Sequence, residues 1–341
     1  MMPCHVSAVD GKRGLMCRKA FSGRVAIRRA MAVACLALAA VPRAAGQTAT
    51  PADRFVGTWK LVATETRNAR GEVVPPAAGA RSPIGYLIYD PGGYMAVSIM
   101  PVGRKRNMGT SVTDDEALAA IRGYTAYFGT FAVNAAEQSV THTLQGSLNP
   151  GMGASQKRFF EMSGDRLTLK PPPSTNGNQA RLTWERLPHL PVLTAEHQKF
   201  VGFWKLVSNE RKDETGKLVA SNPGQTGYII YTRAGFMMVH MVQPNRKPFA
   251  AASPTPAEAG QALRTYANYF GPFYIHESDG YVVHDQVGTA NVGRVGPAPQ
   301  QRFYEFAGPR LLLRPPSAFS PGAPTVQGTI TWEKADVVAT R

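Results

Sequence analysis

Cysteine is scarce in this sequence. The chain has three cysteines in 341 residues, and all of them (Cys4, Cys17 and Cys35) lie within the first 46 residues. If that segment is removed, no thiol remains, which excludes a disulfide framework, a cysteine nucleophile and a cysteine-ligated zinc site. A domain of ordinary size buries enough core without disulfides, so their absence is compatible with export.

Charge is also modest. Charged residues make up 18% of the chain, and the formal net charge of +15 falls to +8 once the basic first 46 residues are set aside. The densest basic run left is Arg104-Lys105-Arg106, which we predict to be a solvated loop end. Without a longer Lys/Arg run, the sequence predicts no nucleic-acid partner.

Several catalytic and metal-binding motifs are missing. No glycine-rich phosphate loop follows a strand and opens a helix, and neither a His-Glu-x-x-His pattern nor a Gly-x-Ser-x-Gly pattern occurs. Their absence argues against a dinucleotide enzyme, a kinase, a hydrolase or a zinc protein. We therefore expect no metal and no cofactor.

The first 46 residues have the pattern of a signal peptide. A basic stretch precedes the apolar run 31–41, and small residues at Ala44 and Gly46 follow it. The apolar run is too short to span a bilayer, so no transmembrane segment is predicted. We expect cleavage near Gly46, before Gln47, and a mature protein that is periplasmic or secreted. A buried N-terminal helix is the alternative.

The rest of the chain is a tandem repeat. The first copy spans residues 55–188, a proline-containing linker spans 189–199, and the second copy spans 200–335. If this linker keeps the contact between the copies small, the copies should unfold separately. The matching segments are FVGTWKLV (55–62) with FVGFWKLV (200–207), IGYLIY (84–89) with TGYIIY (226–231), YTAYFG (124–129) with YANYFG (266–271), KRFFE (157–161) with QRFYE (301–305), RLTLKPP (166–172) with RLLLRPP (310–316), and LTWE (182–185) with ITWE (330–333).

Each copy is predicted to consist mainly of strands. Short runs rich in Val, Ile, Tyr, Phe and Thr alternate with Gly, Pro, Asn and Asp breaks. One helix interrupts each copy, because the capping boxes at 113–116 and 255–258 both start helical patterns. In the first copy we expect this helix to continue to about Tyr127. Its aromatic residues would either plug the barrel end or line its mouth.

These motifs together resemble the lipocalin-like domains of bacteria and fungi. The resemblance rests on GTWKLV, GYLIY, DPGGYM, YFGTF, SLNP, QKRFFE, GDRLTL and LTWE, and covers nearly all of each copy. It implies an all-β fold: two tandem eight-stranded antiparallel barrels, each with one short helix. It also implies that Trp59 and Trp204 close a barrel end, and that a pocket lies inside. The second copy departs from the pattern at SLNP, at Tyr94 and in VTH, which predicts that the working site lies in the first copy.

Paired histidines and arginines are the main candidate site residues. His142 and His284 occupy matching positions, and strand alternation turns His142 toward the barrel interior. An inward histidine can titrate near neutral pH, whereas the alternative is a hydrogen-bonded core residue. Arg158 and Arg302 also match, and an inward arginine would select a carboxylate. The alternative is an arginine that stacks on a barrel-end tryptophan or pairs with a glutamate at the rim.

Tyrosine and methionine side chains complete the predicted binding set. Tyr86 and Tyr89 lie on opposite faces of one strand, so only one of them can point inward, and the same holds for Tyr228 and Tyr231. Met95 would add an adaptable apolar lining. The predicted ligand-binding residues are Tyr86, Tyr89, Met95, His142, Arg158, Tyr228, His284 and Arg302, with His142 as the catalytic candidate.

Three functions remain open from the sequence. The first is binding or carriage of a small, largely apolar or amphipathic molecule. The second is a cofactor-free isomerase or cyclase, for which His142 would contact Arg158 or a tyrosine inside a closed pocket. The third is a structural module whose barrel is filled by side chains. An open cavity with few polar groups favours the first, and a filled barrel favours the third.

Overall fold

The computed structural model describes residues 50–293, 298–317 and 325–338 of the chain. The predicted leader and its cleavage position lie outside these residues. The chain from Thr48 onward forms one compact unit that contains both repeats.

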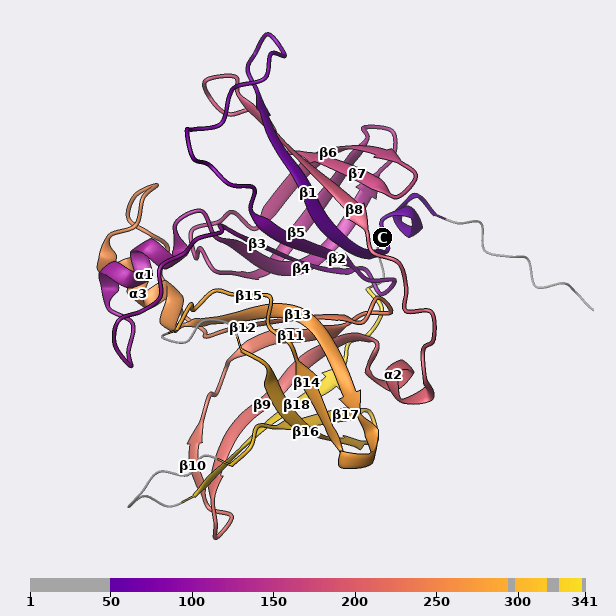
Figure 1. Cartoon of the computed structure of the whole chain (residues 1–341), viewed down its shortest axis with the longest axis vertical. Helices are drawn as coiled ribbons and strands as arrows, with labels where there is room; N and C mark the ends of the chain where they lie inside the picture. The colour runs from indigo at the N-terminus through magenta and orange to yellow at the C-terminus, as the bar shows by residue number, and fades with distance from the viewer. Residues whose placement is uncertain (1–49, 294–297, 318–324, 339–341) are drawn as a thin grey trace, which may run out of the picture. The chain divides into compact units, whose positions relative to one another are not determined.

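The first repeat is a closed antiparallel barrel in which each strand pairs with the next and β8 pairs back to β1 (Figure 1). A short 3-10 helix (Pro51–Arg54) precedes it. The strands are β1 (Gly57–Arg67), β2 (Ile84–Tyr89), β3 (Tyr94–Met100), β4 (Thr125–Asn134), β5 (Ser139–Ser147), β6 (Ser155–Ser163), β7 (Arg166–Lys170) and β8 (Gln179–Arg186).

The second repeat has the same barrel with two added strands. The eight barrel strands close because β18 pairs with β9. The two added strands are β10, which pairs antiparallel with β9, and β15, which pairs antiparallel with β13. Hence the predicted fold of two eight-stranded barrels is confirmed. The strands are β9 (Gly202–Asp213), β10 (Leu218–Ser221), β11 (Thr226–Tyr231), β12 (Phe236–Val242), β13 (Tyr266–His276), β14 (Tyr281–His284), β15 (Gly288–Thr289), β16 (Gln300–Ala307), β17 (Arg310–Arg314) and β18 (Val326–Lys334).

Helices are few and short in the described residues. They are α1 (Asp114–Ile121), α2 (Ala195–Phe200) in the connection between the barrels, α3 (Pro256–Arg264) and a 3-10 turn (Glu277–Asp279). Both capping boxes form: the Thr113 and Thr255 hydroxyls accept from the backbone N–H of Glu116 and Glu258. These bonds satisfy N–H groups that would otherwise lack partners at the helix start.

The prediction that the first helix reaches Tyr127 is wrong. The helix ends at Ile121, and Gly123 then adopts a φ of +72°, a conformation that glycine takes without strain. The following aromatics therefore belong to β4, where alternation sends Tyr127 into the barrel and Tyr124 and Phe128 to its outer face. Leu118 and Ile121 of α1 line an open groove, so the helix does not plug the barrel.

Trp59 and Trp204 are buried at equivalent places in the first strand of each barrel. The Trp59 indole N–H donates to the Phe55 carbonyl at 2.7 Å, and the Arg186 guanidinium carbon lies 4.1 Å from its ring centroid. Gly57 allows this stacking, because its φ is +147° and a Cβ there would come within 2.8 Å of Arg186 Nη1. Lys334 covers Trp204 in the second barrel. The cations on these tryptophans are thus Arg186 and Lys334, and the stacking alternative for Arg158 and Arg302 is wrong.

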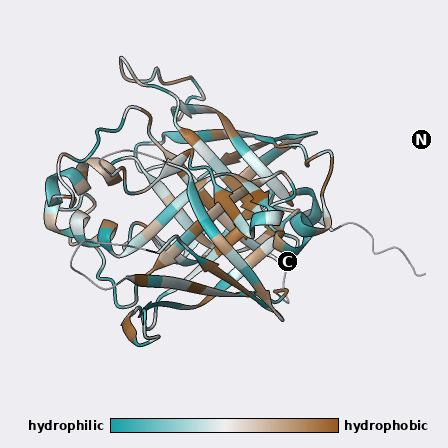
Figure 2. Ribbon diagram, turned by 60° about the horizontal axis from the view of Figure 1, so that its bottom comes forward, coloured by the Kyte–Doolittle hydropathy of each residue, from teal (hydrophilic) through white to brown (hydrophobic). Residues whose placement is uncertain are grey.

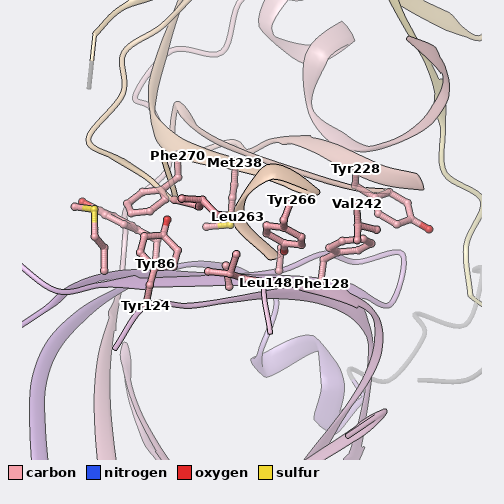
Figure 3. Packing of buried hydrophobic residues seen from close by; sticks show 14 of the residues in the cluster. Tyr86, Tyr124, Phe128, Leu148, Tyr228, Met238, Val242, Leu263, Tyr266 and Phe270 are labelled. Carbon is pink, nitrogen blue, oxygen red and sulfur yellow. The ribbon is translucent and has the colours of Figure 1, made fainter. Parts of the chain in front are cut away.

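The two barrels share a buried apolar interface. The outer faces of β2, β3 and β4 pack against those of β11, β12 and β13, and α1 lies beside α3 (Figures 1 and 3). Hydrophobic residues concentrate on the central strands, whereas loops and the outer helix faces are mostly hydrophilic (Figure 2). The condition for separate unfolding, a small contact between the repeats, is therefore not met, because one core cluster contains side chains of both.

Two arginines hold this interface at matching positions. Arg104 donates to the carbonyls of Thr289 and Ala290 in the other barrel, and Arg246 donates to those of Ser147 and Leu148. Each guanidinium also bonds a carbonyl near the end of its own helix. The prediction of a solvated loop end holds for Lys105 and Arg106, which are exposed in a loop, but is wrong for Arg104. The N–H groups of its guanidinium satisfy carbonyls that the contact would otherwise leave without partners.

Candidate functional site

A cavity of about 200 Å³ lies inside the first barrel. Pockets for drug-sized ligands measure about 300–1,000 Å³, so this one suits a smaller molecule. Its apolar wall consists of Leu87, Val97, Ile99, Leu169, Pro171 and Leu182. Its polar groups come from Thr125, Tyr127, His142, Arg158 and Trp184.

A Tyr–His–Tyr cluster stands at the polar side of this cavity. The Tyr89 hydroxyl lies 2.7 Å from His142 Nε2, and the Tyr127 hydroxyl lies 3.0 Å from His142 Nδ1. The three side chains come from β2, β5 and β4 and are all buried. Since a neutral imidazole has one N–H and one acceptor nitrogen, one tyrosine donates to the ring and the other accepts from it. The accepting tyrosine keeps its own proton for another partner.

All three groups of this cluster are uncharged at neutral pH. Burial lowers the pKa of His142 from 6.5 to about 3, and the positive charge of Arg158 acts in the same direction. Burial raises the pKa of Tyr127, while Arg158 partly opposes that change. Burial also raises the pKa of Tyr89 well above its ordinary value. Of the two interpretations of His142, the hydrogen-bonded core residue fits this environment, because burial disfavours the charged form of the imidazole.

Arg158 brings a positive charge to the cavity wall without a neutralising carboxylate. Its guanidinium donates to the Lys157 carbonyl at 2.8 Å and to Gln156 Oε1 at 3.2 Å. Across the described ranges, no aspartate or glutamate forms an ion pair with it. A half-buried cation of this kind can bind a ligand carboxylate by donating two parallel hydrogen bonds to it.

Trp184 supplies a second donor that lacks a partner. Its ring is 1% exposed and lines the cavity, and its buried indole N–H has no hydrogen-bond acceptor. A buried polar group without a partner costs about 1–3 kcal/mol, so such groups call for an explanation. An acceptor atom of a bound molecule would satisfy the Trp184 N–H.

The second barrel carries the same polar cluster. The Tyr231 hydroxyl lies 2.7 Å from His284 Nε2, and the Tyr269 hydroxyl lies 2.9 Å from His284 Nδ1. Burial lowers the pKa of His284 to about 3, again with a contribution from the nearby Arg302. Trp332 has a buried indole N–H without a partner, as Trp184 has.

The predicted site residues fall into two groups. Tyr89, Met95 and His142 lie inside the first barrel, and Arg158 lines its cavity; His284 and Arg302 occupy the matching places in the second. In contrast, Tyr86 and Tyr228 lie in the interface between the barrels. The structure therefore replaces their predicted ligand-binding role with a packing role.

Two functional candidates were missed from the sequence. The sequence pattern places Tyr127 on the helix that precedes β4. It shows Trp184 only as part of LTWE, which matches ITWE in the second copy. Both recur in the second copy, as Tyr269 and Trp332, and this recurrence was the available signal. The pattern could not show that the Trp184 indole lacks a partner whereas the Trp59 indole has one.

No cation site is evident in the part of the chain that the structure describes. Within it, no group of three or more His, Cys, Asp or Glu side chains is placed to hold a metal ion. No helix of residues 50–293, 298–317 or 325–338 is long and apolar enough to cross a membrane.

A first strand with Gly-x-Trp, a closed eight-stranded barrel and an internal cavity define a lipocalin-like protein. The chain matches the lipocalin-like domain family over residues 56–187 and 201–335, so it belongs to that family, in two copies. No curated protein matches the sequence.

Three solved structures give alignments of low similarity. A Nostoc punctiforme protein of unknown function has 10% identity and a TM-score of 0.21, and the alignment covers 84% of this chain and 100% of that one. A putative outer membrane protein from Bacteroides fragilis has 8% identity, a TM-score of 0.22 and coverage of 83% and 99%. A transferrin binding protein B mutant from Haemophilus parasuis has 6% identity, a TM-score of 0.20 and coverage of 81% and 75%. Scores this low do not bear on function.

Proposed function

We propose that the first barrel binds or carries a small, largely apolar molecule that bears a carboxylate. The observation that carries this proposal is an apolar cavity lined, within the described residues, by a cation without a carboxylate partner and by an indole whose N–H has no acceptor. The Arg158 guanidinium has no carboxylate partner among the described residues, and the Trp184 indole N–H has no acceptor. Both line the same cavity of about 200 Å³.

The Tyr–His–Tyr cluster supports the same ligand chemistry. When the His142 Nδ1 carries the proton, Tyr127 accepts from it and its own hydroxyl proton is free to point at a ligand oxygen. Because the histidine stays neutral, it adds no second positive charge beside Arg158. The ligand then meets one cation and two or three neutral donors, which matches a single carboxylate on an apolar body.

The approach to the cavity involves both repeats. Thr125 lines the internal cavity and also an open groove of about 400 Å³ at the corner between α1 and β4. The far wall of this groove is formed by residues of the second copy, among them Phe249 and Pro254. We place the ligand entrance here.

Calorimetric titration of the purified full chain with octanoate, and with octanol as the uncharged control, tests this function. Octanoate should bind and octanol should bind much more weakly. Replacing Arg158 by methionine should weaken octanoate at least about tenfold, because a charged hydrogen bond contributes about 1.5–3 kcal/mol.

Lys157→Met is the matched control, since this neighbouring cation pairs with Glu137 and does not line the cavity. Equal loss in both variants, or octanoate binding that neither variant changes, would remove the basis of the proposal.

The contact between His142 and two tyrosines is the observation that favours the alternative, a cofactor-free isomerase or cyclase. With a pKa of about 3 for His142, such an enzyme would act through neutral hydrogen bonds rather than through an imidazolium. Incubation with an extract of small carboxylates, followed by chromatographic separation of isomers and mass spectrometry, should then reveal a product that His142→Gln does not form. Bound but unchanged compounds support carriage.

We also propose that the chain is exported by its N-terminal segment. The support is the sequence pattern of residues 1–46 and the absence of cysteine after Cys35.

A further inference from the structure

The second barrel repeats four of the five polar residues that line the first cavity. Tyr269, His284, Arg302 and Trp332 correspond to Tyr127, His142, Arg158 and Trp184. Arg302 donates to the Gln301 carbonyl at 2.7 Å and to Gln300 Oε1 at 3.3 Å, and no carboxylate of the described residues pairs with it. The Trp332 indole is 1% exposed, and its N–H has no acceptor. In the described part of the chain, each barrel therefore has an arginine without a carboxylate partner and a tryptophan whose indole N–H has no acceptor.

The apolar residues that line the first cavity have apolar counterparts in the second copy. Three wall residues of the first cavity recur unchanged, and three others are exchanged for apolar residues of similar volume, which cores tolerate well. Only one hydroxyl is lost. The unchanged pairs are Val97 with Val239, Leu169 with Leu313 and Pro171 with Pro315; the exchanged apolar ones are Leu87 with Ile229, Ile99 with Met241 and Leu182 with Ile330. The lost hydroxyl is that of Thr125, where the second copy has Ala267.

The features that set the second copy apart lie elsewhere. Phe236, which stands where the first copy has Tyr94, belongs to the interface between the barrels. The Ser147-Leu148 segment and its counterpart Thr289-Ala290 receive the two interface arginines. These changes adapt two unequal surfaces to each other, so they give no reason to place the working site in the first copy alone.

The second barrel also has an opening beside its cluster. A groove of about 390 Å³ is lined by Ala267 and Tyr269, the counterparts of Thr125 and Tyr127 in the first cavity. Tyr269 is the residue whose hydroxyl contacts His284. Gln225, Gln243 and Asn291 give this groove a polar rim. Tyr269 therefore belongs both to this groove and to the cluster.

From these observations we infer that the second barrel is a second binding site for the same class of ligand, a small apolar carboxylate, held by Arg302, Trp332 and Tyr269. The inference rests on the function proposed for the first barrel and extends it to two ligands per chain. Because Ala267 replaces Thr125, the second site offers one hydroxyl fewer and accepts a more uniformly apolar body.

The four tryptophans allow a direct test by NMR. The indole N–H groups of Trp59 and Trp204 already donate to backbone carbonyls, whereas those of Trp184 and Trp332 have no partner. In the full chain labelled with ¹⁵N-tryptophan, octanoate should shift the Trp184 and Trp332 indole resonances and leave those of Trp59 and Trp204 as internal controls. Single Trp→Phe variants assign the four resonances.

Native mass spectrometry of the same protein with octanoate gives the stoichiometry. Two bound ligands are expected for the wild type, one for Arg158→Met, one for Arg302→Met and none for the double variant. The wild-type count needs no variant, so the test holds even if a variant fails to fold. A single bound ligand, lost in Arg158→Met and kept in Arg302→Met with no Trp332 shift, overturns this inference and leaves the first site standing. No octanoate binding at all overturns both.

Discussion

The ring of Tyr86 in the first barrel stacks on the ring of Phe236 in the second, with centroids 4.1 Å apart and an interplanar angle of 25°. Both side chains belong to the core cluster that the barrels share, and Figure 3 shows Tyr86 within this cluster. Apolar area buried between domains contributes about 25 cal/mol per Å², and a large hydrophobic contact prevents independent domain motion. The two repeats are therefore coupled in stability.

We predict that the chain unfolds in one cooperative transition. Phe236→Ala should lower the stability of the whole chain by about 3–5 kcal/mol, because it leaves a cavity in the shared core. Phe303→Ala, which truncates a 42% exposed ring on the same barrel, is the control and should have little effect. Calorimetry and urea unfolding measure both. Two separate transitions in the wild type would show that the interface does not couple the barrels.

The interface arginines predict a second effect on stability. Arg104→Met and Arg246→Met should each destabilise the chain by about 2–4 kcal/mol, since each leaves partly buried carbonyls without a donor. Arg106→Met removes an exposed charge two residues away and should change stability by less than about 0.5 kcal/mol. Urea midpoints of the three variants make the comparison. If all three variants behave alike, the guanidinium contacts contribute nothing specific.

The fold was predictable because the same strand pattern occurs in both copies of the repeat. Matching segments in two copies identified the strands, the first-strand tryptophans and the paired His142 and Arg158 without any coordinates. The interface was not predicted, although IGYLIY and YMAVSIM contain almost no polar position. An antiparallel strand with one solvated face alternates apolar and polar residues, so a continuous apolar run indicates burial of both faces. The pocket prediction for Tyr86 assumes that its strand buries one face only, whereas the outer face of the strand is buried in the interface.

The candidate site was predicted only in part, for a different reason. Strand alternation predicts that His142 points into the barrel, but it does not predict which atoms contact its ring. That Trp59 has an acceptor and Trp184 has none depends on the position of the Phe55 carbonyl, which only the three-dimensional arrangement gives. Likewise, Tyr127 entered the cluster because Gly123 ends the helix early, a consequence of backbone conformation rather than of hydrophobic spacing.

The N-terminal segment leads to a third prediction. Protein purified from its own host should begin at Gln47 and show no free thiol, because all three cysteines precede that residue. Edman sequencing and a thiol assay with Ellman's reagent check this. A mature chain that retains Cys35 would contradict the predicted cleavage.

Three buried histidines predict how stability depends on pH. Burial lowers the pKa of His142, His240 and His284 from 6.5 to about 3 in the folded chain. The unfolded chain binds protons at these residues below about pH 6.5, and the folded chain does not. Stability is therefore full above that pH and falls as the pH decreases from about 6.5 toward 3. Each histidine contributes up to about 1.4 kcal/mol for each pH unit in this window.

Urea unfolding of the full chain at several pH values between about 7 and 5 measures this slope, in a range above that in which most carboxylates titrate. His142→Gln should reduce the slope by about one proton, since the amide can still hydrogen-bond to Tyr89 and Tyr127 but does not titrate. His189→Gln removes an exposed imidazole from the connection between the barrels and should leave the slope unchanged. If the two variants reduce the slope equally, or if the wild type has the same stability throughout this range, His142 is not held neutral by its burial and the electrostatic account of the cavity fails.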